Sequence, residues 1–342
     1  MKTMGAKGGS VKSTVLVVTN EQDESVPAVT NELDRIGVRY HRLDTERFPY
    51  EVALDLHLSG SKAFGAFRWL SLPRTLRIGD ICSVWYRRPL HAWVTKLHPG
   101  HAQFIQDEAR AALWSVYTTI DAFWMNPPLQ AVHLLQHNKL HQLRTAAQLG
   151  LSVPDTVITN DPEVLTDFAD AHEKMIAVKL LRGNCFVREG GSPAPLHVFT
   201  NTLSREDIDG HREDIKLCPV FAQEYIPKQL ELRITIVGNQ VFTCAIHSQD
   251  SEATRLDWRR YDFDRVKHES YALPSDIAEK LRLLIRGWGL AYGAIDMIVT
   301  PKGEYVFLEI NPSGQWLWIE QATGMPISRA IAETLAVPST TT

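Results

Sequence analysis

The sequence predicts an α+β protein of two or three compact units, and three observations carry this prediction. The chain has 342 residues, more than one domain usually contains. From residue 15 to about residue 124, strand-like apolar runs alternate with helical segments, as in α/β domains. After a breaker, AsnProPro at residues 126–128, short strands predominate, which favours α+β layers with a largely antiparallel sheet.

A flexible arm is expected over residues 1–13 and the first unit over 14–126. The arm contains KGGSVKST, which lacks the glycine that a phosphate-binding loop has before its lysine, and which precedes a strand instead of following one. Strand VLVVT opens the unit, and a helix over 26–36 leads to strand VRYHRLD. VALDLHLSG and AFGAF alternate as antiparallel strands. ICSVWYRRP is a buried strand, and a long helix covers about 101–120.

The second unit is expected over 127–338, as two subdomains of about 127–215 and 216–338. It opens with the helical sequence LLQHNKLHQLRTAAQLG, which stops at Gly150. Strand TVIT, a helix opened by AspPro at 161–162, and strand MIAVKLL come next. Further strands are expected around LHVFT, VFAQEYI, ELRITIVG and QVFTCAI. A helix over 275–288 precedes two strands, YGAIDMIVT and FLEIN, which a turn at Gly303 and Glu304 joins.

Composition narrows the class of protein. Apolar residues make up 44% of the chain and charged residues 22%, as in soluble globular enzymes. The net charge of −4 gives no reason to expect a nucleic-acid partner, and no apolar run approaches the ~18 residues of a membrane span, so no membrane partner is expected. There is no secretory signal, and the four cysteines lack CxxC spacing, which is typical of reduced thiols in a cytoplasmic protein.

The most informative pattern is FLEINPSG, residues 307–314, together with Asp296. Glu309 and Asn311 are two residues apart on a strand, so the carboxylate and the amide oxygen face one side while Ile310 faces the other. Asp296 lies in the paired strand. Three hard oxygen ligands on paired strands suit Mg²⁺ bound to nucleotide phosphates, because this ion takes only a few protein oxygens. The alternative is two strands with ordinary polar outward positions.

Two lysines are candidates for binding phosphate. Lys179 lies near the end of an apolar strand, where a cation is costly to bury without an anion. A strand-end lysine whose head reaches solvent is the alternative. Lys139 follows a helical turn and, taken alone, would be a surface residue.

The segment QEYIPKQLELRITIVG predicts a hinge beside a nucleotide. Its first four residues end a strand before Pro227, and a hinge of this kind has unpaired backbone groups that can read an adenine edge. These residues are Gln223, Glu224, Tyr225 and Ile226. Glu231 and Arg233 share one face of the next strand, where Arg233 can grip a phosphate with two hydrogen bonds. A surface Glu–Arg pair is the alternative.

Several motifs, taken in order, resemble the ATP-grasp superfamily over about residues 127–336. They are NKLHQLRTAAQLGLSVPDT, AVKLLRG, QEYIPKQLELRITIVG, AIDMIV and FLEINPSGQW. Within that superfamily, the peptide maturases of the graspetide class, which include the microviridin macrocyclases, resemble this chain in WYRRP, ELRITIVGNQVF, HSQDSEATRLDWRR and INPSGQWLWIEQATGMPIS. The resemblance implies an ATP-grasp fold with an N-terminal pre-ATP-grasp α/β domain.

The resemblance also implies a role for each matching position, with ATP and Mg²⁺ as the cofactors. The implied nucleotide contacts are Lys139, Lys179 and the hinge from Gln223 to Ile226; the implied metal ligands are Asp296, Glu309 and Asn311; and Arg233 faces the reacting phosphate. The chain departs from the family pattern twice. The family has a phosphate-binding lid with several glycines. This chain has only RGN at residues 182–184 and a later pair of glycines at residues 190–191. Lys228 occupies the position at which related ligases have an acidic residue that binds the ribose. The ribose contact is therefore left open, and Glu231 is the candidate residue for cofactor binding.

The segment TRLDWRRYDFDR, residues 254–265, adds two catalytic candidates. Arg259 and Arg260, beside Trp258, can bind the acidic side chain of a substrate or an acylphosphate. A solvated, self-neutralising loop is the alternative. Arg87 and Arg88 in WYRRP either face the active site or form a structural ion pair.

Three histidines at helical spacing do not predict a zinc site. His133, His137 and His141 would share one helix face, but the acid of an HExxH motif is missing and the run overlaps Lys139. A polar helix face is favoured.

The implied reaction is acyl activation by a cytoplasmic ligase. The expected partner is a ribosomally made precursor peptide with a leader and an acidic core, and a homodimer is a candidate assembly. The enzyme would phosphorylate Asp or Glu side chains and close ester or amide cross-links with Ser, Thr or Lys side chains. The alternatives are an ATP-grasp ligase that joins small amino acids or adds glutamate to a protein, and a non-catalytic nucleotide-dependent binding protein.

Overall fold

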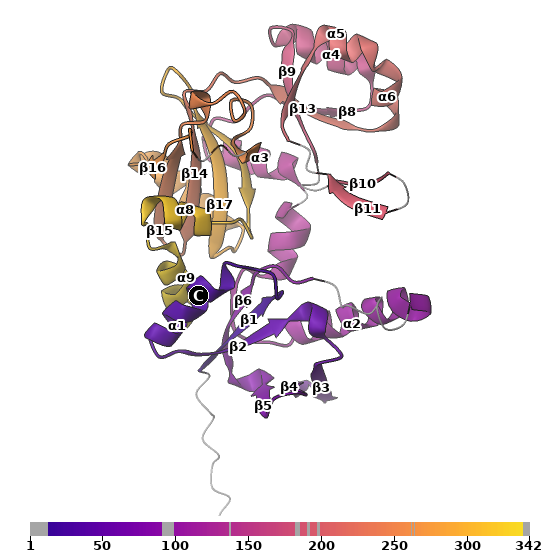
Figure 1. Cartoon of the computed structure of the whole chain (residues 1–342), viewed down its shortest axis with the longest axis vertical. Helices are drawn as coiled ribbons and strands as arrows, with labels where there is room; N and C mark the ends of the chain where they lie inside the picture. Colours follow the sequence, from indigo (N-terminus) through magenta and orange to yellow (C-terminus); the bar gives the residue numbers. More distant parts are fainter. Residues whose placement is uncertain are drawn as a thin grey trace, which may run out of the picture. The chain divides into compact units, whose positions relative to one another are not determined.

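The computed structural model describes residues 13–90, 99–136, 138–181, 185–189, 192–196, 199–260, 262 and 264–337. The chain divides into two compact units, Met1–Pro127 with Ser328–Thr342, and Pro128–Ile327 (Figure 1). The domain ranges inferred from the sequence stay predictions, and residues 1–12 of the predicted arm lie outside the described residues. Within the described residues, no helix is both long and apolar enough to cross a membrane.

The first unit is built on a four-stranded parallel sheet in the order β2–β1–β6–β7, which confirms the predicted α/β pattern. All six residues of β1, TVLVVT, are buried, as expected for a strand that has neighbours on both edges of a covered parallel sheet. The strands are β1 (Thr14–Thr19), β2 (Arg39–Asp44), β6 (Ile81–Tyr86) and β7 (Phe123–Met125).

A second, antiparallel sheet and several helices complete this unit. Leu16 and Val18 of β1 share a core with the second sheet and with the long helix α2. The C-terminal helix α9 also belongs here, because the hydroxyl of Ser83 donates a hydrogen bond to the carbonyl of Leu335. The elements are α1 (Val26–Arg35), α2 (Ala102–Tyr117), α9 (Ile327–Ala336), β3 (Val52–Ser59), β4 (Lys62–Trp69) and β5 (Arg74–Arg77).

The second unit begins with two helical segments instead of the continuous helix that the sequence predicts. A π-helical segment, η5 (Leu129–Gln136), ends before Asn138, and α3 (Lys139–Gln148) starts there. The side chain of Asn138 accepts a hydrogen bond from the backbone N–H of His141 and so caps α3. The cap places Lys139 at the first position of the helix.

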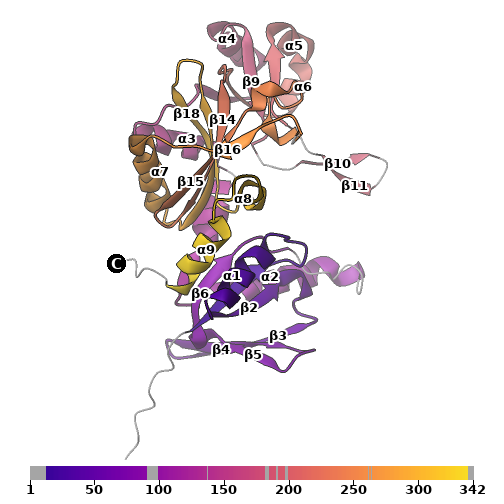
Figure 2. The same cartoon turned by 60° about the vertical axis from the view of Figure 1, so that its left-hand side comes forward.

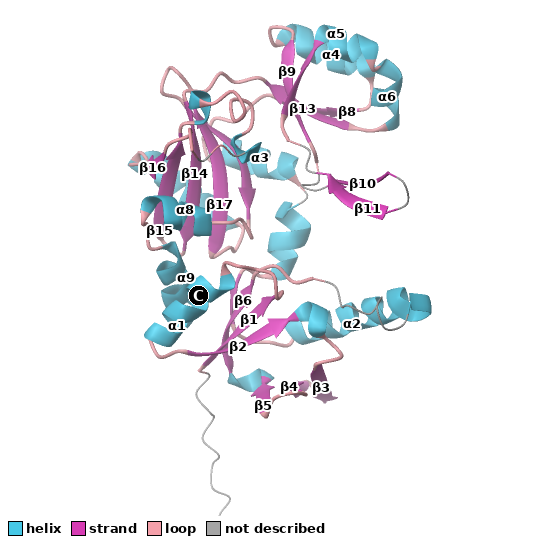
Figure 3. Cartoon of the chain, viewed as in Figure 1, coloured by secondary structure: helices cyan, strands magenta, loops and turns pink. Residues whose placement is uncertain are grey.

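Next comes a four-stranded antiparallel sheet in the order β12–β9–β13–β8, together with three helices (Figure 3). α4 begins where the Asp161 side chain accepts a hydrogen bond from the N–H of Glu163, so the helix predicted at this AspPro is confirmed. The elements are β8 (Thr156–Thr159), α4 (Pro162–Ala171), β9 (Met175–Lys179), β12 (Asn201–Ser204), α5 (Arg205–Gly210), α6 (Arg212–Leu217) and β13 (Val220–Glu224).

The strand expected around LHVFT, residues 196–200, falls partly outside the described residues, since 197 and 198 are among those not described. On either side of them, β11 ends at Leu196 and β12 starts at Asn201. β10 (Cys185–Glu189) and β11 (Ser192–Leu196) pair as a separate two-stranded hairpin. Alternation of apolar and polar residues could not show which of these short runs has a partner strand.

The centre of the second unit is a five-stranded sheet in the order β16–β15–β14–β17–β18, and every neighbouring pair is antiparallel, as predicted. Figure 2 shows α7 and α8 on opposite sides of this sheet. The elements are β14 (Leu230–Val237), β15 (Gln240–Ile246), β16 (His268–Ser270), α7 (Ser275–Gly287), β17 (Tyr292–Val299), β18 (Tyr305–Asn311) and α8 (Leu317–Thr323).

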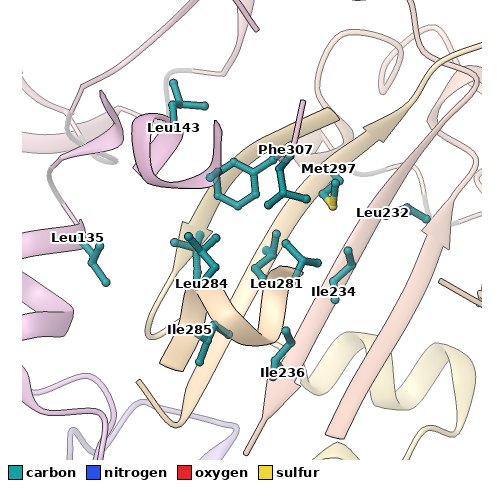
Figure 4. Packing of buried hydrophobic residues seen from close by; sticks show 14 of the residues in the cluster. Leu135, Leu143, Leu232, Ile234, Ile236, Leu281, Leu284, Ile285, Met297 and Phe307 are labelled. Atoms are coloured by element: carbon teal, nitrogen blue, oxygen red, sulfur yellow. The ribbon is translucent and has the colours of Figure 1, made fainter. Parts of the chain in front are cut away.

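The two faces of this sheet differ in chemistry. Leu232, Ile234 and Ile236 of β14 point toward α3 and α7, where they share a buried core with Leu281 and Leu284 (Figure 4). Because side chains alternate along a strand, the residues between them point the other way. One face is therefore an apolar core, and the other is free to carry charged groups.

A single glutamine holds the outer strand of the sheet to α3. β18 is an edge strand, and Gln142 of α3 pairs with the backbone of its residue Ile310. The Ile310 N–H donates to Gln142 Oε1 at 2.9 Å, and Gln142 Nε2 donates to the Ile310 carbonyl at 3.1 Å. The buried amide thus replaces a missing neighbour strand at this position of the sheet edge.

We expect Gln142→Leu to lower the free energy of unfolding by about 1–3 kcal/mol, because it leaves two buried backbone groups of Ile310 without partners. Urea denaturation measures the loss, and hydrogen exchange should show faster exchange in β18. Gln148→Leu on the exposed face of the same helix is the matched control. Equal stability of the two variants would contradict the role of Gln142.

Candidate functional site

A cleft in the second unit brings together most of the residues that the sequence singles out. It comprises about 710 Å³ of empty space, part of which is open to solvent. Its walls come from the polar face of the five-stranded sheet, from β9, from the end of β13 and from the loop before β16. Of the predicted residues, the cleft is lined by Lys179, Gln223, Glu224, Tyr225, Ile226, Glu231, Arg259, Asp296 and Glu309.

Three charged residues form a row across the polar face of the sheet, and two of them, Asp296 and Glu309, line the cleft. Arg233 on β14 lies opposite Asp296 on β17, and Asp296 lies opposite Glu309 on β18. Residues directly opposite one another on antiparallel strands have neighbouring side chains on the same face. The row therefore consists of one positive charge followed by two negative charges, on three adjacent strands.

A β-bulge at Leu308 places the Glu309 side chain in this row. Met297 pairs with Phe307, but Asp296 pairs with Glu309, so Leu308 is an extra residue on β18. Without the bulge, Leu308 would lie opposite Asp296, and Glu309 would point into the apolar core beside Ile295. With it, Leu308 and Glu309 both line the cleft, while Phe307 and Ile310 remain in the core.

Each carboxylate of the row has its own cation. Arg233 Nη1 donates to both oxygens of Asp296, at 2.9 and 3.0 Å. Lys139 Nζ lies 2.7 Å from Glu309 Oε2, so the first residue of α3 reaches the sheet. Burial works against the ionised form of Glu309, but the charges of Lys139 and Lys179 outweigh it and lower the pKa of this carboxyl to about 2. Burial raises the pKa of Asp296, while the charge of Arg233 opposes that rise.

Lys179 lies in the cleft, where the nearby negative charge does not fully offset the cost of burying its ammonium group. Burial is the main cause that lowers its pKa from 10.5 to about 8, and Glu309 only partly opposes this because Lys139 competes for the same carboxylate. No ion pair of Lys179 is present among the described residues. The cleft therefore presents a cation that an added anion would stabilise.

Arg259 is oriented by Asp257. Arg259 Nε donates to Asp257 Oδ1 at 2.9 Å, and its Nη2 donates to Oδ2 at 2.5 Å, which forms a two-pronged pair. The Thr200 N–H also donates to Asp257 Oδ2, at 2.8 Å. Burial alone would raise the pKa of Asp257, but its hydrogen bonds from Arg259 and Thr200 lower the pKa well below its usual range. The pairing with Asp257 also raises the pKa of Arg259.

Arg260 lies elsewhere, although it is the next residue. Its guanidinium donates to Asn201 Oδ1 at 2.9 Å and stacks over the ring of Phe199 at 5.5 Å, and it is not among the cleft-lining residues. Trp258, which precedes Arg259, is buried, with the Arg233 guanidinium 5.8 Å from its ring and the Trp318 ring 5.0 Å away. The structure thus places one arginine of the predicted pair at the cleft.

Glu231 is tied to the lysine that precedes it. Lys228 Nζ lies 2.7 Å from Glu231 Oε1 and 3.0 Å from the Leu256 carbonyl, and both charged side chains line the cleft. Burial raises the pKa of Glu231, and the charge of Lys228 opposes that rise. A ligand hydroxyl at this position would meet a lysine and a carboxylate that are already paired.

The predicted hinge follows the last residue of β13. The Glu224 N–H donates to the Asp155 carbonyl at 3.0 Å, and Glu224 Oε1 accepts from the Asp155 N–H at 3.0 Å, which fixes the end of the strand. Tyr225 and Ile226 continue beyond the strand and line the cleft. Gln223 is buried and donates to Thr156 Oγ1 at 3.1 Å.

The donor set at the end of β18 fits a hard cation that brings most of its own ligands. Asp296 and Glu309 offer carboxylate oxygens, and Asn311 lies exposed two residues further, with its Oδ1 accepting from the Ser313 N–H at 2.9 Å. Among the described residues, no group of three or more His, Cys, Asp or Glu is placed to hold a metal. Two carboxylates and an amide suit Mg²⁺, which keeps water or ligand oxygens in its other positions.

The remaining predictions fall outside the described residues or in the first unit. The reduced phosphate lid, 182–184 and 190–191, and His137 lie outside the described residues. Arg87 is buried in the first unit, where its Nε lies 3.2 Å from Asp23 Oδ2, so the ion-pair alternative holds for this arginine.

Three contributors to the site were missed by sequence reasoning. Gln142, three residues after Lys139, fixes the strand that carries Glu309. Asp257, two residues before Arg259, orients its guanidinium, and that i, i+2 spacing is the signal that could have found it. Gly314 passes close to the row: a Cβ there would lie 2.3 Å from Ala294 Cβ and 2.7 Å from Arg233 Nη2. This close approach explains the glycine of FLEINPSG.

Comparison with known proteins gives two family matches. Residues 14–132 match a model described as the MvdD pre-ATP grasp domain, and residues 136–335, more than half of the chain, match the RimK-like ATP-grasp domain. No curated protein gave a match.

Solved structures with the same fold include three peptide-linked enzymes. The macrocyclase MdnC of Microcystis aeruginosa MRC, bound with precursor peptide MdnA, has 38% identity and a TM-score of 0.80 over 94% of this chain and 99% of that one. A RiPP-associated ATP-grasp ligase of Chryseobacterium gregarium, in complex with ADP and a leader and core peptide, has 29% identity and a TM-score of 0.85 over 94% and 96%. The macrocyclase MdnB of Microcystis aeruginosa MRC has 30% identity and a TM-score of 0.76 over 94% and 99%.

We expect the stability contribution of Glu309 to depend on pH. Its pKa of about 2 in the folded state lies below the ordinary 4.5, so the contribution is complete above pH 4.5 and is lost as pH falls toward 2. Glu309→Gln should therefore lower the free energy of unfolding by about 1–3 kcal/mol at pH 7, and the difference from wild type should narrow below pH 4.5.

Urea denaturation at several pH values measures this difference. Glu304→Gln, on the exposed turn of the same hairpin, is the matched control and should show no comparable effect. A Glu309→Gln difference that stays constant down to pH 3 would contradict the ion-pair assignment.

Proposed function

Because the chain belongs to the RimK-like ATP-grasp family, we propose that it is an ADP-forming ligase that closes macrocycles in a ribosomally made precursor peptide. The full-length likeness to MdnC, at 38% identity, supports this function over a ligase for small amino acids. The observation that carries the proposal is the cleft itself. One cavity is lined by Lys179, whose charge is only partly offset, by the ion-paired carboxylates Asp296 and Glu309, and by an arginine that Asp257 orients.

The cleft suits ATP in three respects. Lys179, with its lowered pKa, gains the most from an added phosphate, and Lys139 is a second lysine paired with Glu309. The strand end at Glu224 to Ile226 offers backbone groups to the adenine, as in the inferred hinge. For the ribose, the Lys228–Glu231 pair lines the same cavity, and we place the sugar hydroxyls against it.

Asp296, Glu309 and Asn311 would hold Mg²⁺, which neutralises phosphate charge when bound. Two of these oxygen donors already carry a cation each, since Arg233 binds Asp296 and Lys139 binds Glu309. Glu309 Oε1 takes part in no hydrogen bond within the described residues, so the carboxylate retains room for a second partner.

The reaction then has two balanced steps. A carboxylate oxygen of a peptide Asp or Glu attacks the γ-phosphorus of ATP, the bond to ADP breaks, and an acylphosphate forms. A Ser or Thr hydroxyl, or a Lys amine, next attacks the acyl carbon, phosphate leaves with the bonding electrons, and one proton is released. Protein groups contribute mainly by positioning and by offsetting charge. We assign Arg233 to the reacting phosphate and Arg259 to the carboxylate or acylphosphate.

The chemistry also defines the peptide that would be used. Activation requires a carboxylate, so the core of the precursor must be acidic, and closure requires a hydroxyl or amine within the same chain. A peptide that undergoes several closures gains from a second attachment point, because tethering raises the effective concentration of each reacting pair. We propose that a leader segment supplies this attachment, and that Arg260 supports the loop of Arg259 rather than touching the reacting atoms.

We expect nucleotide binding to take up a proton above pH 8. Free Lys179 has a pKa of about 8, and the phosphates of ADP should raise it toward the ordinary 10.5, so uptake occurs between these values and vanishes below pH 7. The same depressed pKa means that the ionised lysine costs folding stability below pH 8, a cost that disappears as pH rises to 10.5.

Calorimetry at pH 8.5, in buffers with different ionisation enthalpies, measures the proton uptake on titration with ADP. Lys179→Met should abolish the uptake and weaken ADP binding by about tenfold or more. Lys174→Met, in the exposed turn before β9, is the matched control. Wild-type proton uptake in Lys179→Met would contradict the assignment.

The function itself is tested by mass spectrometry of a candidate acidic precursor after incubation with enzyme, ATP and Mg²⁺. Each cross-link should remove one water from the peptide mass. Arg259→Lys cannot keep the two-pronged pair with Asp257, so we expect it to lower cyclisation about a hundredfold while ADP affinity changes little.

Arg265→Lys, an exposed arginine of the same segment, is the control and should cyclise normally. If the enzyme consumes ATP with free amino acids and leaves the precursor mass unchanged, the small-molecule ligase replaces the macrocyclase. Normal cyclisation by Arg259→Lys would remove this arginine from the reaction.

A further inference from the structure

The guanidinium of Arg233 is enclosed from several sides within the second unit. Its Nη1 donates to both oxygens of Asp296, and its Nη2 donates to the Gln315 carbonyl at 3.3 Å. Gly314 leaves room for the same Nη2, since a Cβ at this position would lie 2.7 Å from it. Arg233 is only 6% exposed, so neighbouring groups and not solvent set its position.

One part of this guanidinium has no hydrogen-bond partner. Within the described residues, no acceptor is present for the Nε–H of Arg233, although the atom is buried. The ring of Trp258 is close by, because the guanidinium carbon lies 5.8 Å from the ring centroid. An aromatic face within about 6 Å attracts a cation through the negative charge density of its π electrons. The Trp258 ring can therefore offset part of the cost of burying this cation.

Trp258 is itself fixed by packing between elements that are distant in the sequence. It belongs to a short 3₁₀ turn, Trp258–Arg260, and is 8% exposed. The ring of Trp318, from α8, lies 5.0 Å away at an interplanar angle of 35°. The ring of His268, from β16, lies 5.5 Å from Trp318 at 83°. This series of rings leaves Trp258 little freedom to turn away from Arg233.

The turn that carries Trp258 also carries the second arginine of the site. Asp257 precedes Trp258 and binds the guanidinium of Arg259, which follows it, with two hydrogen bonds. The Arg259 N–H also donates to Asp257 Oδ1, at 3.0 Å, which makes the turn compact. Consecutive residues of one turn thus contact both guanidiniums, so the turn sets where the two cations lie relative to each other.

The spacing of the two guanidiniums matters for the reaction, because one is assigned to the reacting phosphate and the other to the carboxylate that attacks it. We propose that Trp258 is a positioning residue of the ligase, whose ring holds the Arg233 guanidinium in place for the reacting phosphate. This inference rests on the proposed function. Trp258 is not among the residues that line the cleft, so it acts through Arg233.

The contact is tested first, without nucleotide or peptide, by a double-mutant cycle. Arg233→Met removes the charge, Trp258→Leu removes the ring, and a third variant combines the two changes. Their effects on the unfolding equilibrium constant, measured in urea, should be non-additive by about fivefold, because the double variant loses the shared contact only once. Trp288→Leu is the matched control, since this tryptophan is 6% exposed in the apolar core on the other face of the sheet, and its effect should add to that of Arg233→Met.

Turnover measures the positioning role. Site-specific replacement of Trp258 by trifluorotryptophan keeps the shape of the ring nearly unchanged but withdraws electron density from its face. We expect kcat for cyclisation to fall about fivefold, because Arg233 acts on the phosphate in the transition state. ADP lacks the reacting phosphate, so its affinity should stay near wild type, as should KM for the precursor.

The control for this measurement is trifluorotryptophan at Trp288, which should leave kcat unchanged. A tryptophan that only fills space would tolerate the fluorines at either position, so the difference between the two positions separates positioning from packing. If Trp258→Leu does not fold, the fluorinated ring alone decides.

Additive effects in the cycle, or a kcat that the fluorinated ring leaves unchanged in an enzyme that cyclises its precursor, overturn the positioning role and leave the proposed function intact. If wild type forms no cross-link in any precursor, the proposed function fails and the positioning role fails with it. Coupling in the cycle would then show a structural contact only.

Discussion

The cleft depends on one row of charges that crosses the central sheet, from Arg233 through Asp296 to Glu309, with Lys139 closing the row from α3. Burying such charges is costly unless each is paired. Removing one partner leaves the other charge buried without compensation for its desolvation. The pairs Arg233–Asp296 and Lys139–Glu309 keep the row in its ionised form. Replacing a buried ion pair by apolar residues is often neutral for stability, so the charges of this row are consistent with the role in the reaction that we propose for them.

The same row explains why Lys179 is poised for an anion. Glu309 is the nearest compensating carboxylate, but Lys139 already holds one of its oxygens at 2.7 Å. Two lysines that share one carboxylate leave a net positive charge in a partly enclosed space. In the function that we propose, a nucleotide phosphate would supply the missing negative charge, and Arg259, held by Asp257, would offer a guanidinium to the acid that is activated.

Local chemistry, read from the sequence, determined the class of fold, the long strands of the central sheet, and the alternation that places Glu309 and Asn311 on one side of their strand. It did not predict β10, β11, β12 and β16 or the helices α5, α6 and α8. The predicted features depend on residues that are close along the chain, such as the cap at Asp161 or the period of a strand. Tertiary structure alone decided the bulge at Leu308, which brings Glu309 opposite Asp296, and the two bonds from Gln142 that hold this strand. Arg259 and Arg260, adjacent in sequence, also separate only there, because Asp257 and Asn201 hold them in different places. Strand register and side-chain partners arise from hydrogen bonds between distant segments, and no local pattern contains them.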